Sequence, residues 1–167
     1  VGELMRLATE QLEDPIIVVT ADHGEAFGEA GHIGHGQRMH SAVTNVPLVI
    51  QNLAEIPTDG LIQHADVMRA LCERLGVPHP VPAGCDLIDA PRRYAVTQEA
   101  GETRSIFEQK LRIIRGDYER PGYHSGDLTS MRTAEWRYDR SDTSERLFAL
   151  PDEEHNVIAD HPIEASK

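Results

Sequence analysis

The sequence has 167 residues, and its 28 acidic and 16 basic side chains give a net charge of −12. A chain this acidic does not follow a phosphate backbone, so nucleic acid is excluded as an expected partner. Two cysteines are too few for a disulfide scaffold. No apolar stretch is long enough to predict a membrane span.

Lysine is scarce, since Lys110 and Lys167 are the only two among the 16 cations. A lysine-poor acidic surface suits a high-salt cytoplasm, where dense carboxylates keep a protein hydrated. An ordinary acidic protein from an arginine-rich genome explains the composition equally well. The cytoplasm is the preferred compartment, and both origins stay open.

The first half of the chain alternates helix and strand signals. Residues 2–13 predict an amphipathic helix that Pro15 ends. The β-branched run PIIVVT (15–20) and the run VPLVIQ (46–51) each predict a strand of the parallel type that is buried on both faces. A loop rich in glycine and histidine, TADHGEAFGEAGHIGHG, lies between them at residues 20–36.

Residues 66–75 predict a second helix, which Gly76 ends at the position after its last turn. Its apolar side chains recur at i, i+3, i+4 and i+7: Met68, Leu71, Cys72 and Leu75. A further strand is expected in RRYAVTQ (92–98).

The last third of the chain changes character. DLTSMRTAEWRYDR (127–140) and ERLFAL (145–150) alternate and are joined by SDTS, which predicts an antiparallel hairpin. DEEHNVIADHP (152–162) predicts a short closing helix. We therefore expect an α/β fold. Residues 1–90 would form the late half of its sheet with a metal-site loop, and residues 91–167 a small antiparallel subdomain with the closing helix.

Asp22 and His23 directly follow the first predicted strand, where functional groups gather in open α/β sheets. Both can reach one ion only where the chain leaves the sheet, which Gly24 permits. A carboxylate beside an imidazole suits Ca²⁺, Mn²⁺ or Zn²⁺. A helix cap at Asp22 with a solvated His23 is the alternative for the dipeptide alone. The chain that follows favours the metal, because three more histidines lie in this loop or just after it: His32, His35 and His40.

Three segments resemble, in order, the C-terminal half of the sulfatase family within the alkaline-phosphatase superfamily: VVTADHGEAFGEAGHIGHG, TNVPLVI and DVMRALCERLGVP. The closing MRTAEWRYDRSDTSERLFALPDEEHNVIADHP is similar to the end of that family. The resemblance implies the C-terminal part of an alkaline-phosphatase-like α/β sandwich. It also implies a metal-dependent hydrolase of small-molecule or glycan sulfate esters, with one divalent ion, Ca²⁺ first and Mn²⁺ or Zn²⁺ as alternatives.

The resemblance assigns roles residue by residue. Asp22 and His23 match the family's second pair of metal ligands. His35 matches the catalytic lysine or histidine that contacts the sulfate and the bridging ester oxygen, with a surface histidine as the alternative. Glu25 matches no ligand and is expected to anchor the loop, or to support a ligand from outside.

The sequence also departs from that family. Neither Cys72 nor Cys85 lies in the Cys/Ser-x-Pro-x-Arg motif that supplies the sulfatase nucleophile, and the first aspartate pair of metal ligands is missing. We therefore expect the C-terminal portion of a longer enzyme, inactive alone and completed by its N-terminal half. Segment 99–127 departs most and is expected to be a surface insertion, or else part of the substrate rim.

Two further functions stay open. One is a phosphodiesterase, phosphonate hydrolase or phosphoglycerol transferase of the same superfamily, which would use an unmodified serine or threonine nucleophile. The other is a non-catalytic metal-binding or interaction domain.

Overall fold

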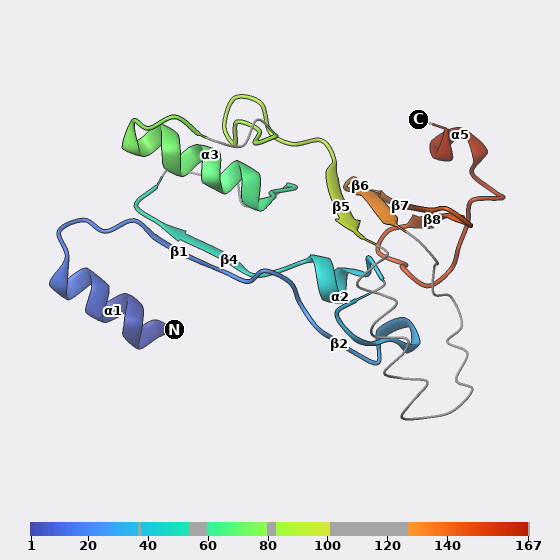
Figure 1. The fold of residues 1–167 in the computed structure, drawn as a ribbon, viewed down its shortest axis with the longest axis horizontal. Coiled ribbons are helices and arrows are strands. Elements are labelled where there is room, and N and C mark those ends of the chain that lie inside the picture. The colour runs from blue at the N-terminus through green and yellow to red at the C-terminus, as the bar shows by residue number, and fades with distance from the viewer. Residues whose placement is uncertain (37, 54–59, 80–82, 101–126, 167) are drawn as a thin grey trace. The chain divides into compact units, whose positions relative to one another are not determined.

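The computed structural model describes residues 1–36, 38–53, 60–79, 83–100 and 127–166 (Figure 1). The chain divides into two compact units. The first contains Val1–Asp22 and Val46–Arg93, and the second contains His23–Asn45 and Tyr94–Lys167. The domain boundary expected at residue 90 stays a prediction.

The first unit begins with α1 (Gly2–Gln11), a helix where the sequence predicts one. Strands β1 (Ile17–Thr20) and β4 (Leu48–Gln51) form a two-stranded sheet. The parallel, doubly buried character expected of these strands is wrong for this pair, because they run antiparallel and none of their residues is fully buried. An all-apolar run indicates packing on both faces of a strand but does not fix the direction of its neighbour.

Helix α3 (His64–Leu75) runs alongside this sheet, and its His64 side chain lies 2.9 Å from the Ala21 carbonyl oxygen (Figure 1). The helix ends, as predicted, at Gly76, whose φ of 66° is left-handed. The predicted apolar stripe is only partly buried, since Met68 is 44% exposed and Leu75 is 63% exposed. The buried residues of the helix are Asp66, Val67 and Cys72.

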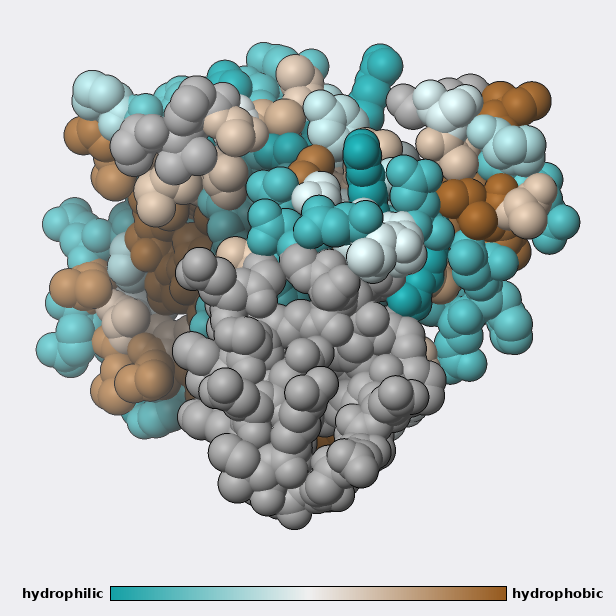
Figure 2. Space-filling model, turned by 45° about the vertical axis from the view of Figure 1, so that its right-hand side comes forward, coloured by the Kyte–Doolittle hydropathy of each residue, from teal (hydrophilic) through white to brown (hydrophobic). Residues whose placement is uncertain are grey.

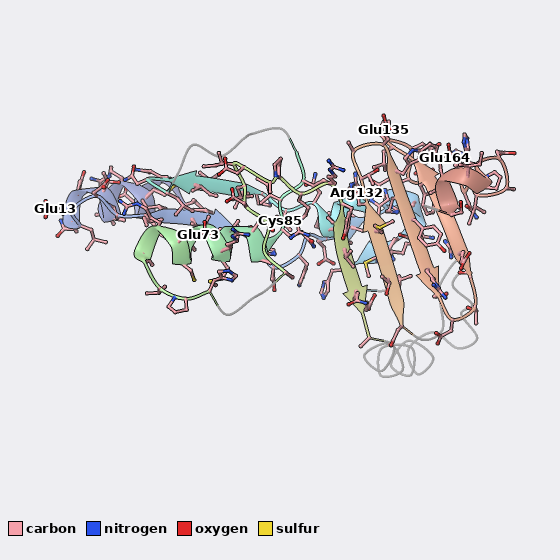
Figure 3. The ribbon with its side chains drawn as sticks, turned by 90° about the horizontal axis from the view of Figure 1, so that it is seen from above. Glu13, Glu73, Cys85, Arg132, Glu135 and Glu164 are labelled. Atoms are coloured by element: carbon pink, nitrogen blue, oxygen red, sulfur yellow. The ribbon has the colours of Figure 1, made fainter. Side chains whose placement is uncertain are left out.

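Asp66 fastens the segment after α3 to the helix. Its carboxylate is fully buried and accepts hydrogen bonds from Arg92 Nε at 2.8 Å and from the Cys85 backbone N–H at 2.7 Å. Burial raises the pKa of Asp66, but Arg92 and the backbone donors outweigh it and hold that pKa below its ordinary value. Figure 3 labels Cys85 in this segment.

The second unit contains a four-stranded antiparallel sheet in the order β5 (Ala95–Glu99), β6 (Leu128–Arg132), β7 (Trp136–Ser141) and β8 (Glu145–Ala149) (Figures 1 and 3). The predicted hairpin is present between β7 and β8. Residues 127–140 form two strands rather than one, because the chain turns after β6. The Trp136 backbone N–H donates to Thr133 Oγ1 at 3.0 Å in that turn.

The predicted helix over 152–162 is wrong, because this segment forms turns and the helix α5 is restricted to Pro162–Ala165. Side chains in the segment bind backbone N–H groups that a helix would need. Asp152 accepts from Glu154 N–H at 2.8 Å, and Asn156 accepts from Ile158 N–H at 3.2 Å. Proline suits the first helical position, where α5 begins.

Apolar side chains remain on the surface of both units, and brown atoms are visible among the teal ones in Figure 2. In the second unit, Phe27 and Ile33 face each other across two short strands and are 81% and 69% exposed. Among the described residues, no helix has the length and hydropathy needed to cross a membrane.

Candidate metal and catalytic site

Three side chains of the second unit, His23, Glu25 and His35, come together at its surface. One ligand atom from each lies within 4.8 Å of the others, and across the described ranges no other group of three histidine, cysteine or carboxylate side chains has this geometry. The His23 and His35 rings stack with centroids 4.1 Å apart and planes 23° apart. All three residues are exposed.

A small hairpin brings the cluster together. Strands β2 (Ala26–Phe27) and β3 (Ile33–Gly34) pair Ala26 with Gly34. Glu25 precedes one strand and His35 follows the other, so this pairing places their side chains side by side. His35 Nδ1 donates to Glu25 Oε2 at 2.9 Å. The turn between the strands needs Gly28, whose φ is 141°.

The hydrogen bonds of the two histidines select their ring nitrogens. His23 Nδ1 lies 2.9 Å from the Gly24 carbonyl oxygen, which can only accept, so Nδ1 carries the proton. His35 Nδ1 likewise donates to the Glu25 carboxylate. Either ring would therefore reach a metal ion or a substrate through Nε2. Metal-binding histidines use the same pattern, in which the second ring nitrogen donates to a carbonyl or carboxylate.

Gly24 lies between His23 and Glu25 and packs against helix α2 (Ser41–Thr44). The Gly24 N–H donates to the Val43 carbonyl at 2.7 Å. A Cβ at Gly24 would lie 2.1 Å from the Ala42 carbonyl oxygen. Glycine is expected at this position to let the chain leave the strand, and the close approach to α2 is a second reason for it.

The structure brings together His23 and His35, two of the three site residues expected from the sequence. The third, Asp22, is exposed and is the last residue of the first unit, joined to His23 by the peptide bond. The structure adds Glu25 to the group of potential ligands. His32 is 2% exposed, and His40 Nδ1 accepts from the Ala42 N–H at 3.0 Å to cap α2.

Glu25 was expected to anchor the loop or to support a metal ligand from outside, and not to be a ligand itself. The signal that could have found it is its spacing, because a hairpin centred near residue 30 places Glu25 and His35 opposite each other. Segment 99–127, expected to be a surface insertion or part of the substrate rim, lies outside the described residues except at its ends.

No protein-family model and no curated protein matches the chain. Among solved structures, it is similar to the phosphonate monoester hydrolase of Agrobacterium radiobacter, with 22% sequence identity and a TM-score of 0.69. The match covers 99% of this chain and 36% of that one. It confirms the expected fold class, a portion of an alkaline-phosphatase-like α/β fold with a small antiparallel sheet.

Proposed function

We propose that this chain is the metal-binding, C-terminal part of a hydrolase of the alkaline-phosphatase superfamily that acts on sulfate esters. Asp22 and His23 supply two ligands of one divalent ion, and His35 acts on the ester. The observation that carries the proposal is the stacking of His35 on His23, with ring centroids 4.1 Å apart, while His35 Nδ1 donates to Glu25. The fold match to a phosphonate monoester hydrolase supports the superfamily.

The donor set fits a divalent ion. Asp22 offers a carboxylate and His23 an imidazole whose Nδ1 is already held by a carbonyl. Ca²⁺, the first expectation, prefers a shell of oxygen ligands, while imidazole with carboxylate also suits Mn²⁺ and Zn²⁺. Two protein donors leave most of the shell to water or to ligands from the N-terminal half of the enzyme. When bound, the ion would polarise the ester oxygens and orient the nucleophile.

His35 has the geometry of a general acid. Glu25 accepts the Nδ1 proton, which leaves Nε2 to face the substrate, and in the protonated ring Nε2–H can donate to the oxygen of the leaving group. The same positive charge would stabilise the charge that develops on the transferring group. A ligand atom of His35 lies within 4.8 Å of those of His23 and Glu25, and we give His35 the substrate on the resemblance, which matches it to the residue that contacts the ester.

Phosphonate monoesters are the second candidate substrate class, because the solved structure with this fold is a phosphonate monoester hydrolase. Neither the imidazolium nor the metal distinguishes sulfur from phosphorus. The nucleophile would decide, since a formylglycine precursor motif in the N-terminal half favours sulfate esters and an unmodified serine or threonine favours phosphoryl transfer.

The full-length enzyme tests the proposal with paired substrates, aryl and alkyl sulfates beside aryl and alkyl phosphonates. We expect Asp22→Ala to lose both bound metal and turnover. His35→Ala should keep its metal and lose about 10²- to 10⁴-fold in rate on the alkyl esters, and far less on the activated aryl esters. His35→Lys should recover part of that rate, because lysine supplies the same charge and a donor.

Opposite results separate the roles. Stoichiometric metal and near-normal turnover in Asp22→Ala would remove Asp22 from the site. Equal losses on good and poor leaving groups would argue against an acid role for His35. A loss of bound metal in His35→Ala would make His35 a ligand, together with His23 and Glu25.

A further inference from the structure

Charged side chains occupy the buried face of the sheet in the second unit. Arg137 on β7 is 4% exposed, and its Nη1 forms an ion pair with Glu153 Oε2. Arg132, which ends β6 and is labelled in Figure 3, reaches the other carboxylate oxygen of Glu153 at 3.3 Å. Glu153 itself comes from the turns after β8 and is 7% exposed.

Glu153 stays ionised in this buried position. Burial raises its pKa, but hydrogen bonding from Ser41 and the charges of Arg137 and Arg132 outweigh burial and lower the pKa below its ordinary value. A buried carboxylate with two guanidinium partners is held in one place, because losing either partner would leave an uncompensated charge.

Glu153 also contacts helix α2, outside the sheet. Its Oε2 accepts a hydrogen bond from the Ser41 backbone N–H at 3.0 Å, at the first residue of α2. The first N–H groups of a helix have no partner within the helix. Glu153 supplies one here, and the His40 side chain supplies the next. The ion pair on the sheet therefore fixes the beginning of α2.

The other end of α2 contacts the candidate site. The Val43 carbonyl accepts from the Gly24 N–H at 2.7 Å, and the Gly24 Cα has no room to move toward Ala42. His23 and Glu25 flank Gly24 in the sequence, so a shift of α2 would also move these two residues. A continuous set of short contacts thus joins Glu153 to the two side chains that hold His35.

We propose that Glu153 is a positioning residue for this site. Its ion pair with Arg137 and its hydrogen bond from Ser41 N–H hold α2 in place, and α2 holds both His23, the proposed metal ligand, and Glu25, which binds His35. The metal-binding part rests on the proposed function, whereas the positioning of the two rings does not. Glu153 lies 112 residues from Ser41 in the sequence, so the C-terminal part of the chain contributes to the geometry of the site.

Ser41 offers a matched pair of variants. Ser41→Pro removes the N–H that Glu153 accepts from and leaves the Glu153–Arg137 pair intact. Proline fits there, because Ser41 is the first helical residue and His40 before it has φ −64° and ψ 147°, in the region that precedes proline. Ser41→Ala removes the same hydroxyl but keeps the N–H, and is the control.

Two measurements on the whole chain decide the proposal. Isothermal titration with Mn²⁺ should show binding about 10-fold weaker in Ser41→Pro than in Ser41→Ala, the loss typical of a removed outer-shell contact. NMR should show proton–proton contacts between the His23 and His35 rings in Ser41→Ala and not in Ser41→Pro. Equal Mn²⁺ affinities, or ring contacts kept in both variants, would overturn the proposal. If even the unmodified chain does not bind Mn²⁺, metal binding by this chain fails, and the ring contacts still decide the positioning.

A second pair of variants tests the same role without proline, which could itself disturb folding. Glu153→Gln removes the anchoring charge. Asp139→Asn removes another buried carboxylate that pairs with Arg137, at 3.3 Å, but whose hydrogen bond comes from Ser130 on β6 and not from α2. Burial raises the pKa of Asp139, so a neutral side chain is tolerated there. We expect Glu153→Gln to lose the ring contacts and Asp139→Asn to keep them. The same result in both variants would refute a specific role for Glu153.

Discussion

Gly24→Ala tests the packing contact between α2 and the candidate site. Gly24 lies between His23 and Glu25, and an added Cβ would lie 2.1 Å from the Ala42 carbonyl oxygen and 3.1 Å from the Ala42 carbonyl carbon. Both neighbours are backbone atoms of a helix, so neither can rotate away as a flexible side chain would. The loop or the helix must move.

The displacement sets the magnitude. Ordinary contacts of a Cβ begin near 3.4 Å, so the carbonyl oxygen must retreat by about 1 Å, which is larger than a packed element absorbs without loss. Overpacking of this kind costs about 1–3 kcal/mol of unfolding free energy. The 2.7 Å hydrogen bond from Gly24 N–H to Val43 would lengthen with the shift and add about 1 kcal/mol.

Urea unfolding followed by the fluorescence of the single tryptophan, Trp136, measures this loss, and Mn²⁺ titration measures the effect on the site. Gly36→Ala is the matched control, because it lies in the same loop and, among the described residues, its Cβ would meet only the Glu99 side chain, at 3.4 Å. We expect Gly24→Ala to lose stability and ring stacking while Gly36→Ala keeps both. Unchanged stability and unchanged Mn²⁺ affinity in Gly24→Ala would refute the close packing of the loop on α2.

Three further outcomes follow from other contacts. Asp66→Asn should cost about 3–5 kcal/mol, because it leaves Arg92 without its buried partner. Because the pKa of Asp66 is lowered from 3.8, its contribution to the free energy of unfolding is present above that pH and is lost as the pH falls further. Urea unfolding of the variant should not show this loss of stability at acid pH. Asp152, with its pKa lowered to about 2, raises the pKa of His155, whose contribution is lost as the pH rises through that raised value. Asp152→Asn should return the His155 NMR titration midpoint toward 6.5. The chain alone should hydrolyse neither aryl sulfates nor phosphate diesters and should bind metal weakly, since two protein donors leave most of the shell to water. Tight calorimetric binding by the chain alone would favour an independent metal-binding domain.

Local signals predicted the elements that local chemistry determines. Helix α3 ends at Gly76 because a left-handed residue there satisfies the last carbonyls, and this can be read from the sequence. The β7–β8 hairpin follows from alternation on both sides of a polar turn. Residues 152–162 were unpredictable from periodicity, because side chains such as Asp152 bind the backbone and compete with a helix.

The site was half predictable for a related reason. His23 and His35 stand out in the sequence, because histidines gather in this segment and its glycines permit a tight loop around them. Glu25 did not stand out, since its link to His35 depends on a ladder of only two residue pairs. A ladder so short gives no alternation pattern that could fix its register.

The buried charges of the sheet could not be predicted from the alternation of apolar and polar residues. Strand β7 alternates Trp136 and Tyr138 with Arg137 and Asp139, and apolarity alone would turn the aromatic face inward. The structure leaves Trp136 and Tyr138 half-buried and buries Arg137 and Asp139, because Glu153 approaches from outside the strand and neutralises Arg137. That pair costs desolvation that an apolar face would not, which fits a role in fixing one arrangement more than a role in stability. The arrangement it fixes includes Ser41 and, through α2, the candidate site. Replacing Arg137 and Glu153 together by apolar side chains should therefore retain the sheet and lose the stacking of the two histidine rings.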